Sequence, residues 1–308
     1  MAVAITSTTR FSERRRGMAR TRRNIAGLLF VTPAFVFVTI FFFVPLVMAG
    51  WVSLHDWPLF GAQHYIGVEN YRTMFADEKF WRSFWFTTRY ALLVTPLIFL
   101  LGFALALLVN QDVRGVGFFR TVYFLPSVVG FGAACLLWYF MSNDQFGIIN
   151  TSLRRLGIVD GSLLWLSKYE TAMILILALV VWKTAGGTML LLLIGMQAIP
   201  EDLYQAAMVD GAGRLQRLRS ITLPLLKRTF ALALVLSITG SYLAFDQFYI
   251  LTRGGPRNQT TSLVQLITSQ AFSAFDVGYA TTISIALMVL LILLSGVQLF
   301  LLRDSTQY

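Results

Sequence analysis

Long apolar runs separated by short polar breaks fill most of this 308-residue chain. The strands of a transmembrane barrel would alternate in far shorter segments, and a helix needs about 20 residues to cross a bilayer. The pattern therefore predicts an all-α integral membrane protein with six transmembrane helices in a domain over 25–303, flanked by tails at 1–24 and 304–308. The predicted spans cover residues 25–51, 84–109, 119–141, 171–196, 225–251 and 279–302.

The polar break at residues 199–226 has the pattern of a folded element. Pro200 suits the first position of a helix, and Gly211 and Gly213 interrupt the helical spacing of the apolar residues. A second apolar stripe follows, and Pro224 is expected to end it. The break is therefore predicted to form two short helices joined by a glycine turn. Its small and apolar side chains suit a surface on which another protein docks.

Composition and charge set the environment and the orientation. The chain is 56% hydrophobic and 13% charged, with a mean hydropathy of +0.68, which excludes an ordinary soluble domain. Most of its 25 Lys and Arg residues fall in segments that are cytoplasmic if the N-terminus is inside. This bias predicts a multi-pass membrane protein with both termini and residues 199–226 in the cytoplasm. The net charge of +10 is then explained by topology and by anionic lipid, and we expect no nucleic acid partner.

Residues with catalytic or metal-binding chemistry are scarce. His55 and His64 lie in one predicted outer loop, and Cys135 is the single cysteine, so neither a metal site nor a disulfide is expected. The chain has no Walker A sequence, so any ATP that drives it is expected to bind another polypeptide. No pair of carboxylates lies within a predicted span, which disfavours an ion-coupled carrier. We expect no enzymatic activity from this chain.

Several motifs resemble a known family. The sequences QAAMVDGA and ITLPLL, within residues 199–226, resemble the EAA loop that couples permeases of binding-protein-dependent ABC importers to their ATPase. Gln205 stands where that family usually has glutamate, and Leu218 where an aromatic residue is common. YIGVENYRTMF at 65–75, FFRTVYFLPSVV at 118–129 and FDQFYILTRGGPRNQTTSL at 245–263 resemble the carbohydrate branch, of the maltose and glycerol-phosphate type. The resemblance assigns ATPase coupling to Leu203, Gln205, Ala206, Ala207, Asp210, Gly211, Ala212, Leu218, Ile221, Leu223 and Pro224.

The resemblance implies the ABC importer permease (MetI-like) fold, in a bacterial or archaeal inner or plasma membrane, and a sugar or sugar-like solute moved inward by alternating access. It also implies a second permease subunit of a different sequence, two ATPase subunits that bind ATP and Mg²⁺, and an extracytoplasmic solute-binding protein. Glycerol phosphate or another non-sugar solute is the main alternative. A secondary carrier or channel is a further alternative, which the two-helix break disfavours.

Polar and aromatic residues inside the spans are candidates for the solute pathway. Lys183 lies in the middle of the fourth span, where a cation must face the protein interior or a wet cavity. An ion pair or a carbonyl contact that holds helices together is an equal alternative for it. The other candidates are Trp182 beside it and Tyr242, Asp246 and Gln247 in the fifth span, which suit sugar hydroxyls and ring faces. Small residues at Gly130-x-Gly132, at Ser237 and at Thr239-Gly-Ser are interpreted as helix-packing faces.

Overall fold

A computed structural model describes residues 30–111 and 113–301. The predicted tails, 1–24 and 304–308, and the outer limits of the first and last predicted spans lie outside these residues. The first half of the described chain contains the π-helical segment η1 (Thr39–Phe43), α2 (Val44–Val52), β1 (His55–Asp56), β2 (His64–Tyr65), α3 (Glu69–Ala76), α4 (Glu78–Val109), α5 (Val116–Val128), α6 (Phe131–Met141) and α7 (Ile148–Arg155).

The second half is helical throughout its regular elements. They are α8 (Tyr169–Gln197), α9 (Glu201–Val209), α10 (Arg214–Arg217), the π-helical segment η2 (Leu218–Thr222), α11 (Leu223–Leu225), α12 (Lys227–Tyr242), the π-helical segment η3 (Phe248–Thr252), α13 (Leu263–Phe272) and α14 (Val277–Leu301). The two short strands pair antiparallel, with His55 opposite Tyr65.

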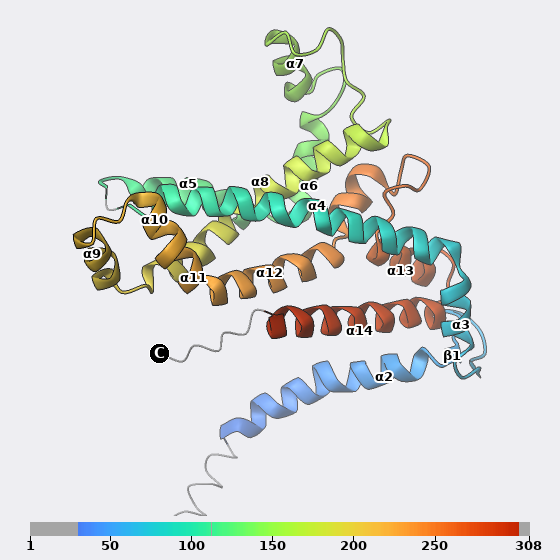
Figure 1. The fold of residues 1–308 in the computed structure, drawn as a ribbon. Coiled ribbons are helices and arrows are strands. Elements are labelled where there is room, and N and C mark those ends of the chain that lie inside the picture. The colour runs from blue at the N-terminus through green and yellow to red at the C-terminus, as the bar shows by residue number, and fades with distance from the viewer. Residues whose placement is uncertain (1–29, 112, 302–308) are drawn as a thin grey trace, which may run out of the picture.

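Long apolar helices form the body of the molecule (Figure 1). Four are long and apolar enough to cross a membrane, namely Phe30–Val52, α4, α8 and α14, and two bent helix pairs bring the number to as many as six among the described residues. α4 packs on α8 and α12, and α14 packs on α2, α12 and α13. The helices α9 to α11 lie at one end of the bundle, and β1 and α3 lie at the opposite end (Figure 1).

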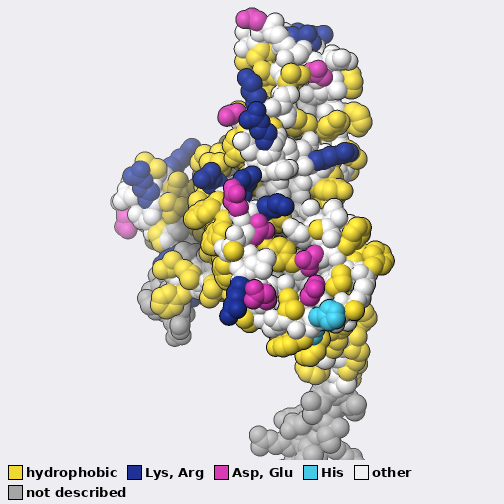
Figure 2. All heavy atoms as spheres, turned by 90° about the vertical axis from the view of Figure 1, so that its right-hand side faces the viewer, with side chains coloured by type: hydrophobic (Ala, Val, Ile, Leu, Met, Phe, Trp, Pro, Cys, Tyr) yellow, Lys and Arg dark blue, Asp and Glu magenta, His cyan; other side chains and the backbone are white. Residues whose placement is uncertain are grey.

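The end that carries α3 and β1 is rich in charge. Figure 2 looks onto it and shows acidic and basic side chains scattered over it between apolar ones. Two exposed ion pairs lie there, Arg72 with Glu69 and Arg82 with Glu78. A polar end of this kind suits contact with water rather than with lipid.

The predicted third span is wrong in one respect, because it is broken. α5 and α6 meet at an angle of 93°, and the joint is Val129 and Gly130. Pro126 has no N–H to donate in the last turn of α5, and Val129 is extended, with φ −64° and ψ 132°. Gly130, interpreted from the sequence as part of a packing face, is instead the first residue before α6.

The predicted fifth span, 225–251, is also interrupted. α12 ends at Tyr242. After residues 243–245 the chain is helical again, first at Asp246 and Gln247 and then in η3. Neither proline nor glycine marks this break in the sequence. The break frees the carbonyl of Ala244, which accepts a hydrogen bond from Ser262 Oγ at 2.8 Å. A side chain far away in the sequence therefore supplies the partner that the helix no longer supplies.

A tight contact between α5 and α8 gives the first prediction. A Cβ atom at Gly186 would collide with the backbone of Tyr123 and Phe124, whereas at Gly187 its nearest neighbour would be Ser127 Oγ at 3.8 Å. We expect Gly186→Ala to destabilise the folded subunit by about 1–3 kcal/mol through overpacking. Gly187→Ala is the matched control and is expected to leave stability unchanged. Thermal unfolding of both purified variants in detergent measures the difference, and equal midpoints would contradict this packing.

Candidate functional sites: a central cavity and a two-helix loop

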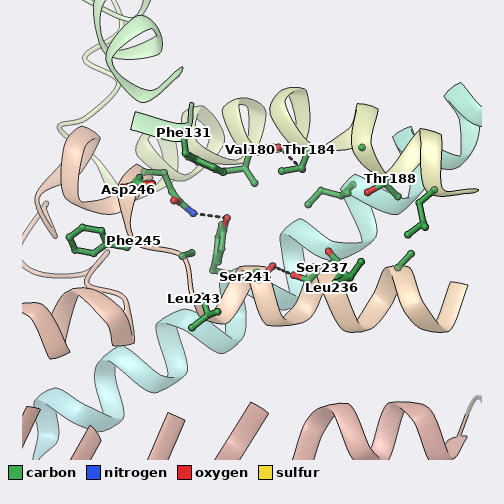
Figure 3. Close-up of a pocket in the computed structure, with 18 residues that line it drawn as sticks. Phe131, Val180, Thr184, Thr188, Leu236, Ser237, Ser241, Leu243, Phe245 and Asp246 are labelled. Atoms are coloured by element: carbon green, nitrogen blue, oxygen red, sulfur yellow. Dashed lines mark hydrogen bonds between the residues drawn. The ribbon is translucent and has the colours of Figure 1, made fainter. Parts of the chain in front are cut away.

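A cavity of about 620 Å³ lies between the long helices. Helices α4, α6, α8 and α12, the break at residues 243–245 and the two residues after it supply its walls. In Figure 3 Thr184 and Thr188 of α8 face Leu236 and Ser237 of α12 across it. Its lining residues are Tyr90, Ile98, Phe131, Val180, Thr184, Gly187, Thr188, Leu191, Ala233, Leu236, Ser237, Gly240, Ser241, Leu243, Ala244, Phe245, Asp246 and Gln247. This size and mixed lining are typical of sites for small molecules.

Two hydroxyl groups in the cavity wall donate hydrogen bonds to backbone carbonyls of their own helices. Thr184 Oγ1 donates to the carbonyl of Val180 at 2.6 Å, and Ser241 Oγ donates to the carbonyl of Ser237 at 2.8 Å. The oxygen lone pairs of these two hydroxyls are thereby left to accept hydrogen bonds from a bound molecule. The cavity wall therefore accepts hydrogen bonds more readily than it donates them.

Asp246 and Gln247 add a carboxylate and an amide to the same wall. Gln247 is only 3% exposed, and its Nε2 donates to the hydroxyl of Tyr90 at 3.0 Å. That bond joins the short helix after the break to α4, so the break holds a fixed position beside the cavity. Asp246 and Gln247 are the two sequence-predicted pathway residues that line this cavity.

The other three predicted pathway residues lie elsewhere. Tyr242 is buried, and its hydroxyl lies 3.0 Å from Thr88 Oγ1. Trp182 lines a separate apolar groove between α4 and α8, with its ring 5.9 Å from that of Trp138. Lys183 is buried beside the joint of α5 and α6, where its Nζ donates to the carbonyl of Val129 at 2.6 Å. Their assignment to the solute path stays a prediction without support from this geometry.

Several cavity residues escaped the sequence interpretation. Ser237, Gly240 and Ser241 were interpreted as packing faces of the fifth span, yet they line the cavity. Their spacing of i, i+3 and i+4 on one face of α12 is the signal that was available. Thr184, Gly187 and Thr188 in the fourth span have the same spacing, so the same signal was available there.

The loop at 199–226 contains the predicted pair of helices around a glycine turn. α9 ends at Val209, and Gly211 follows its C-cap residue, Asp210, with φ +81°. The N–H of Ala212 donates to the carbonyl of Ala207 at 2.8 Å, and that of Gly211 donates to Met208 at 3.1 Å. This pattern is a Schellman motif, in which the left-handed position strongly favours glycine.

The end of the second helix differs from the prediction. The helical path continues through Pro224 to Leu225 and then turns by 65° into α12. The π-helical segment η2 precedes Pro224, and the N–H of Leu223 there donates to the carbonyl of Leu218. The wider π turn accommodates a proline without ending the helix. Pro224 is therefore inside the second helix rather than its stop.

Predicted coupling residues on this loop divide into an exposed and a half-buried set. The exposed residues are Leu203, Gln205, Ala206, Asp210, Gly211, Leu223 and Pro224, and the half-buried ones are Ala207, Ala212, Leu218 and Ile221. Val209, absent from the prediction, is 88% exposed at the end of α9. An exposed apolar face of this kind, on a helix that the other described residues leave open, suits a docking surface.

An inner cluster of apolar residues ties the loop to the long helices. It contains Leu192 and Met196 of α8 and Leu226 before α12, and Tyr204 and Ile221 of the loop pack against it. The hydroxyl of Tyr204 also lies 3.0 Å from Thr222 Oγ1, which joins α9 to the second helix. A Cβ atom at Gly195 would contact Thr229 and Leu226, so α8 and α12 approach closely there.

Comparison with known proteins gives the family. Residues 98–305 match the family described as binding-protein-dependent transport system inner membrane component. The chain is 35% identical to the trehalose/maltose transport system permease protein MalF of Thermococcus litoralis, over 86% of this chain and 90% of the relative. It is 32% identical to the sn-glycerol-3-phosphate transport system permease protein UgpA of Salmonella choleraesuis, over 91% of this chain and 95% of the relative.

A solved structure shares the fold. A chain of the bacterial alginate ABC transporter, crystallised with an alginate-bound periplasmic protein, superposes with a TM-score of 0.80 at 23% identity, over 92% of this chain and 96% of that one. The predicted all-α permease fold is thereby confirmed. Sequence and fold together place this chain in the family of binding-protein-dependent transport system inner membrane components, the permease subunits of ABC importers.

Proposed function

We propose that this chain forms one half of the path by which an ATP-driven importer moves a neutral sugar, or a sugar-like solute, into the cell. The central cavity carries the proposal. Sugar hydroxyls need hydrogen-bond acceptors, which Asp246, Thr184 and Ser241 supply, and sugar ring faces pack on aromatic rings such as those of Phe131 and Phe245. The name of one relative, a trehalose/maltose permease, agrees with a solute of this kind, whereas that of another, an sn-glycerol-3-phosphate permease, represents the main alternative.

Charge in the cavity favours a neutral sugar over glycerol phosphate. A phosphate would need a cation near it, but the described lining contains neither lysine nor arginine and includes the carboxylate of Asp246. Lys183, the cation that a phosphate would have used, donates to backbone carbonyls instead. A phosphorylated solute would therefore meet repulsion rather than attraction.

The 199–226 loop is proposed to receive the ATPase. Two ATPase subunits would hold ATP and Mg²⁺, since no nucleotide site is expected on this chain. The exposed face of α9 would contact one of them, and the inner cluster would pass its movement to α8 and α12. Thr188 of the cavity lies on α8 only eight residues before Met196 of that cluster, a rise of about 12 Å. This short path supports alternating access driven from the loop, and it disfavours a carrier or channel without an ATPase.

The remaining partners follow from the same assembly. A second permease subunit, of a different sequence, would complete the cavity, and a solute-binding protein would dock at the end that carries α3 and β1. That end would then face outward, and both termini and the 199–226 loop would lie in the cytoplasm, in accord with the distribution of Lys and Arg.

Asp246 provides the test of the solute class. Removing a hydrogen bond to a charged group costs about 1.5–3 kcal/mol, which raises the KM for sugar uptake about tenfold or more. We expect this increase in KM for Asp246→Asn. Uptake is measured in proteoliposomes that contain the whole importer, and a prior screen of neutral sugars and glycerol 3-phosphate identifies the solute. Asp160→Asn, which changes an exposed carboxylate between α7 and α8, is the control. Faster uptake of glycerol 3-phosphate by Asp246→Asn, with sugar uptake unaffected, would contradict a neutral solute.

Gly211 tests the docking loop. A valine in its left-handed conformation is expected to cost about 1–3 kcal/mol and to distort the turn between the two helices. Gly211→Val should keep the subunit in the membrane but reduce both solute uptake and co-purification of the ATPase. Gly213→Val is the matched control, because Gly213 has φ −70° and open space around its Cβ position. If Gly211→Val takes up solute and retains the ATPase as the parent does, the proposal that this loop docks the ATPase is wrong.

Single cysteines test the orientation. Gln216 and Asn258 are both exposed, one in the docking loop and one near the opposite end. In a Cys135→Ala background, we expect an impermeant maleimide on intact cells to label Asn258→Cys and to leave Gln216→Cys unlabelled until the membrane is opened. The reverse pattern would overturn the proposed orientation.

A further inference from the structure

Lys183 lies at the break between α5 and α6 rather than in the cavity. It is 7% exposed, and its Nζ donates to the carbonyl of Val129 at 2.6 Å and to that of Ser127 at 3.4 Å. The last carbonyls of a helix have no partner within the helix. A cation at a helix C-terminus also interacts favourably with the helix dipole. The ammonium group therefore satisfies the end of α5.

The contact runs in both directions. Ser127 Oγ donates to the backbone carbonyl of Lys183 at 2.7 Å, while the side chain of Lys183 donates to the carbonyl of Ser127. Ser127 and Lys183, called the α5–α8 clamp below, thus join the end of α5 to the middle of α8 through crossed hydrogen bonds. Gly186 allows the two backbones to approach closely enough for this, because a side chain there would meet Tyr123.

α6 begins directly beside the clamp. α6 leaves the joint at 93° to α5, and its first residue is Phe131. The ring centroid of Phe131 lies 5.1 Å from Lys183 Nζ, and the ring also lines the cavity (Figure 3). Val129, at the joint, therefore contacts the clamp, and Phe131, two residues later, lines the proposed solute site.

We propose that the α5–α8 clamp is a positioning device, which holds the broken helix so that Phe131 forms a wall of the cavity. Lys183 then acts on the solute through Phe131 and never touches it. Its ammonium group is occupied by two carbonyls and a ring, and Lys183 is not among the residues that line the cavity. The importance of this wall for a sugar rests on the proposed function, whereas the positioning itself does not.

The position of α6 is measurable without any solute. A Cβ atom at Gly132, one residue after Phe131, would lie 3.7 Å from Ile250 Cδ1 of η3. In a Cys135→Ala background, Gly132→Cys and Ile250→Cys should be joined efficiently by a short bifunctional methanethiosulfonate in the assembled complex. The cross-linked fraction therefore reports whether α6 starts in the position that the structure shows.

We expect Lys183→Met to lower this fraction severalfold and Ser127→Ala to lower it by a smaller factor. Lys183→Arg keeps a cationic donor at the joint and should restore most of the cross-link. Thr121→Val is the control, since Thr121 donates only to Gly117 within α5. Fractions are compared in complexes purified by size, so that misassembled protein is excluded.

The outcomes decide the proposal in each case. Parent-like cross-linking in both Lys183→Met and Ser127→Ala would overturn it, as would an equal loss in Thr121→Val, which would indicate general loosening. If Lys183→Met does not assemble, Ser127→Ala decides alone, and an unchanged fraction there overturns the clamp. Because no sugar is present, a failure of the proposed solute class leaves these results unaffected.

Discussion

Backbone groups inside a bilayer have no water to bind, so every interruption of a membrane helix needs a partner from the protein itself. In this structure, side chains from other segments donate hydrogen bonds to the backbone carbonyls at such places. Lys183 donates to the end of α5, Arg120 donates to the carbonyl of Val109 at the end of α4, and Ser262 donates to Ala244 at the break after α12. Two of these donors are cations, which act where a helix dipole is negative. Lys183 and Arg120 are thereby explained as donors to helix-end carbonyls, and Lys183 supplies this contact at the broken helix beside the cavity.

The sequence predicted those features that a local signal encodes. Spans are visible because apolar length is set by the bilayer, and the turn at Gly211 is visible because few other residues tolerate its backbone. The break after Tyr242 was not predicted, because what stabilises it is Ser262, a hydrogen-bond partner in another segment. The joint at Val129 gave a partial signal through Pro126 and Gly130, but an apolar run with one proline is equally typical of a kinked continuous helix.

The same distinction separates the cavity residues that the sequence singled out from those that it did not. Asp246 and Gln247 were predicted because polar groups that adjoin an apolar run require an explanation. Ser237 and Ser241 were assigned to packing because a small hydroxyl residue on a membrane helix commonly satisfies itself on its own backbone, and the hydroxyl of Ser241 does so. These hydroxyls also border a cavity, because α8 and α4 lie opposite α12. That arrangement belongs to the tertiary structure and has no local signal in the sequence.

The cavity and the docking loop share α8 and α12, and this arrangement constrains any mechanism. Near the loop these two helices approach closely around Gly195 and Leu226, so that end is tightly packed. Towards the cavity they separate, and Thr184 and Ser237 face each other across open space. A rotation imposed at the packed end must therefore change the width of the open end, because the helices between them are stiff. The clamp at Lys183 lies on α8 beside this open end, so α5 and the start of α6 would move together with α8, and the cavity would change shape as a whole rather than one side chain at a time.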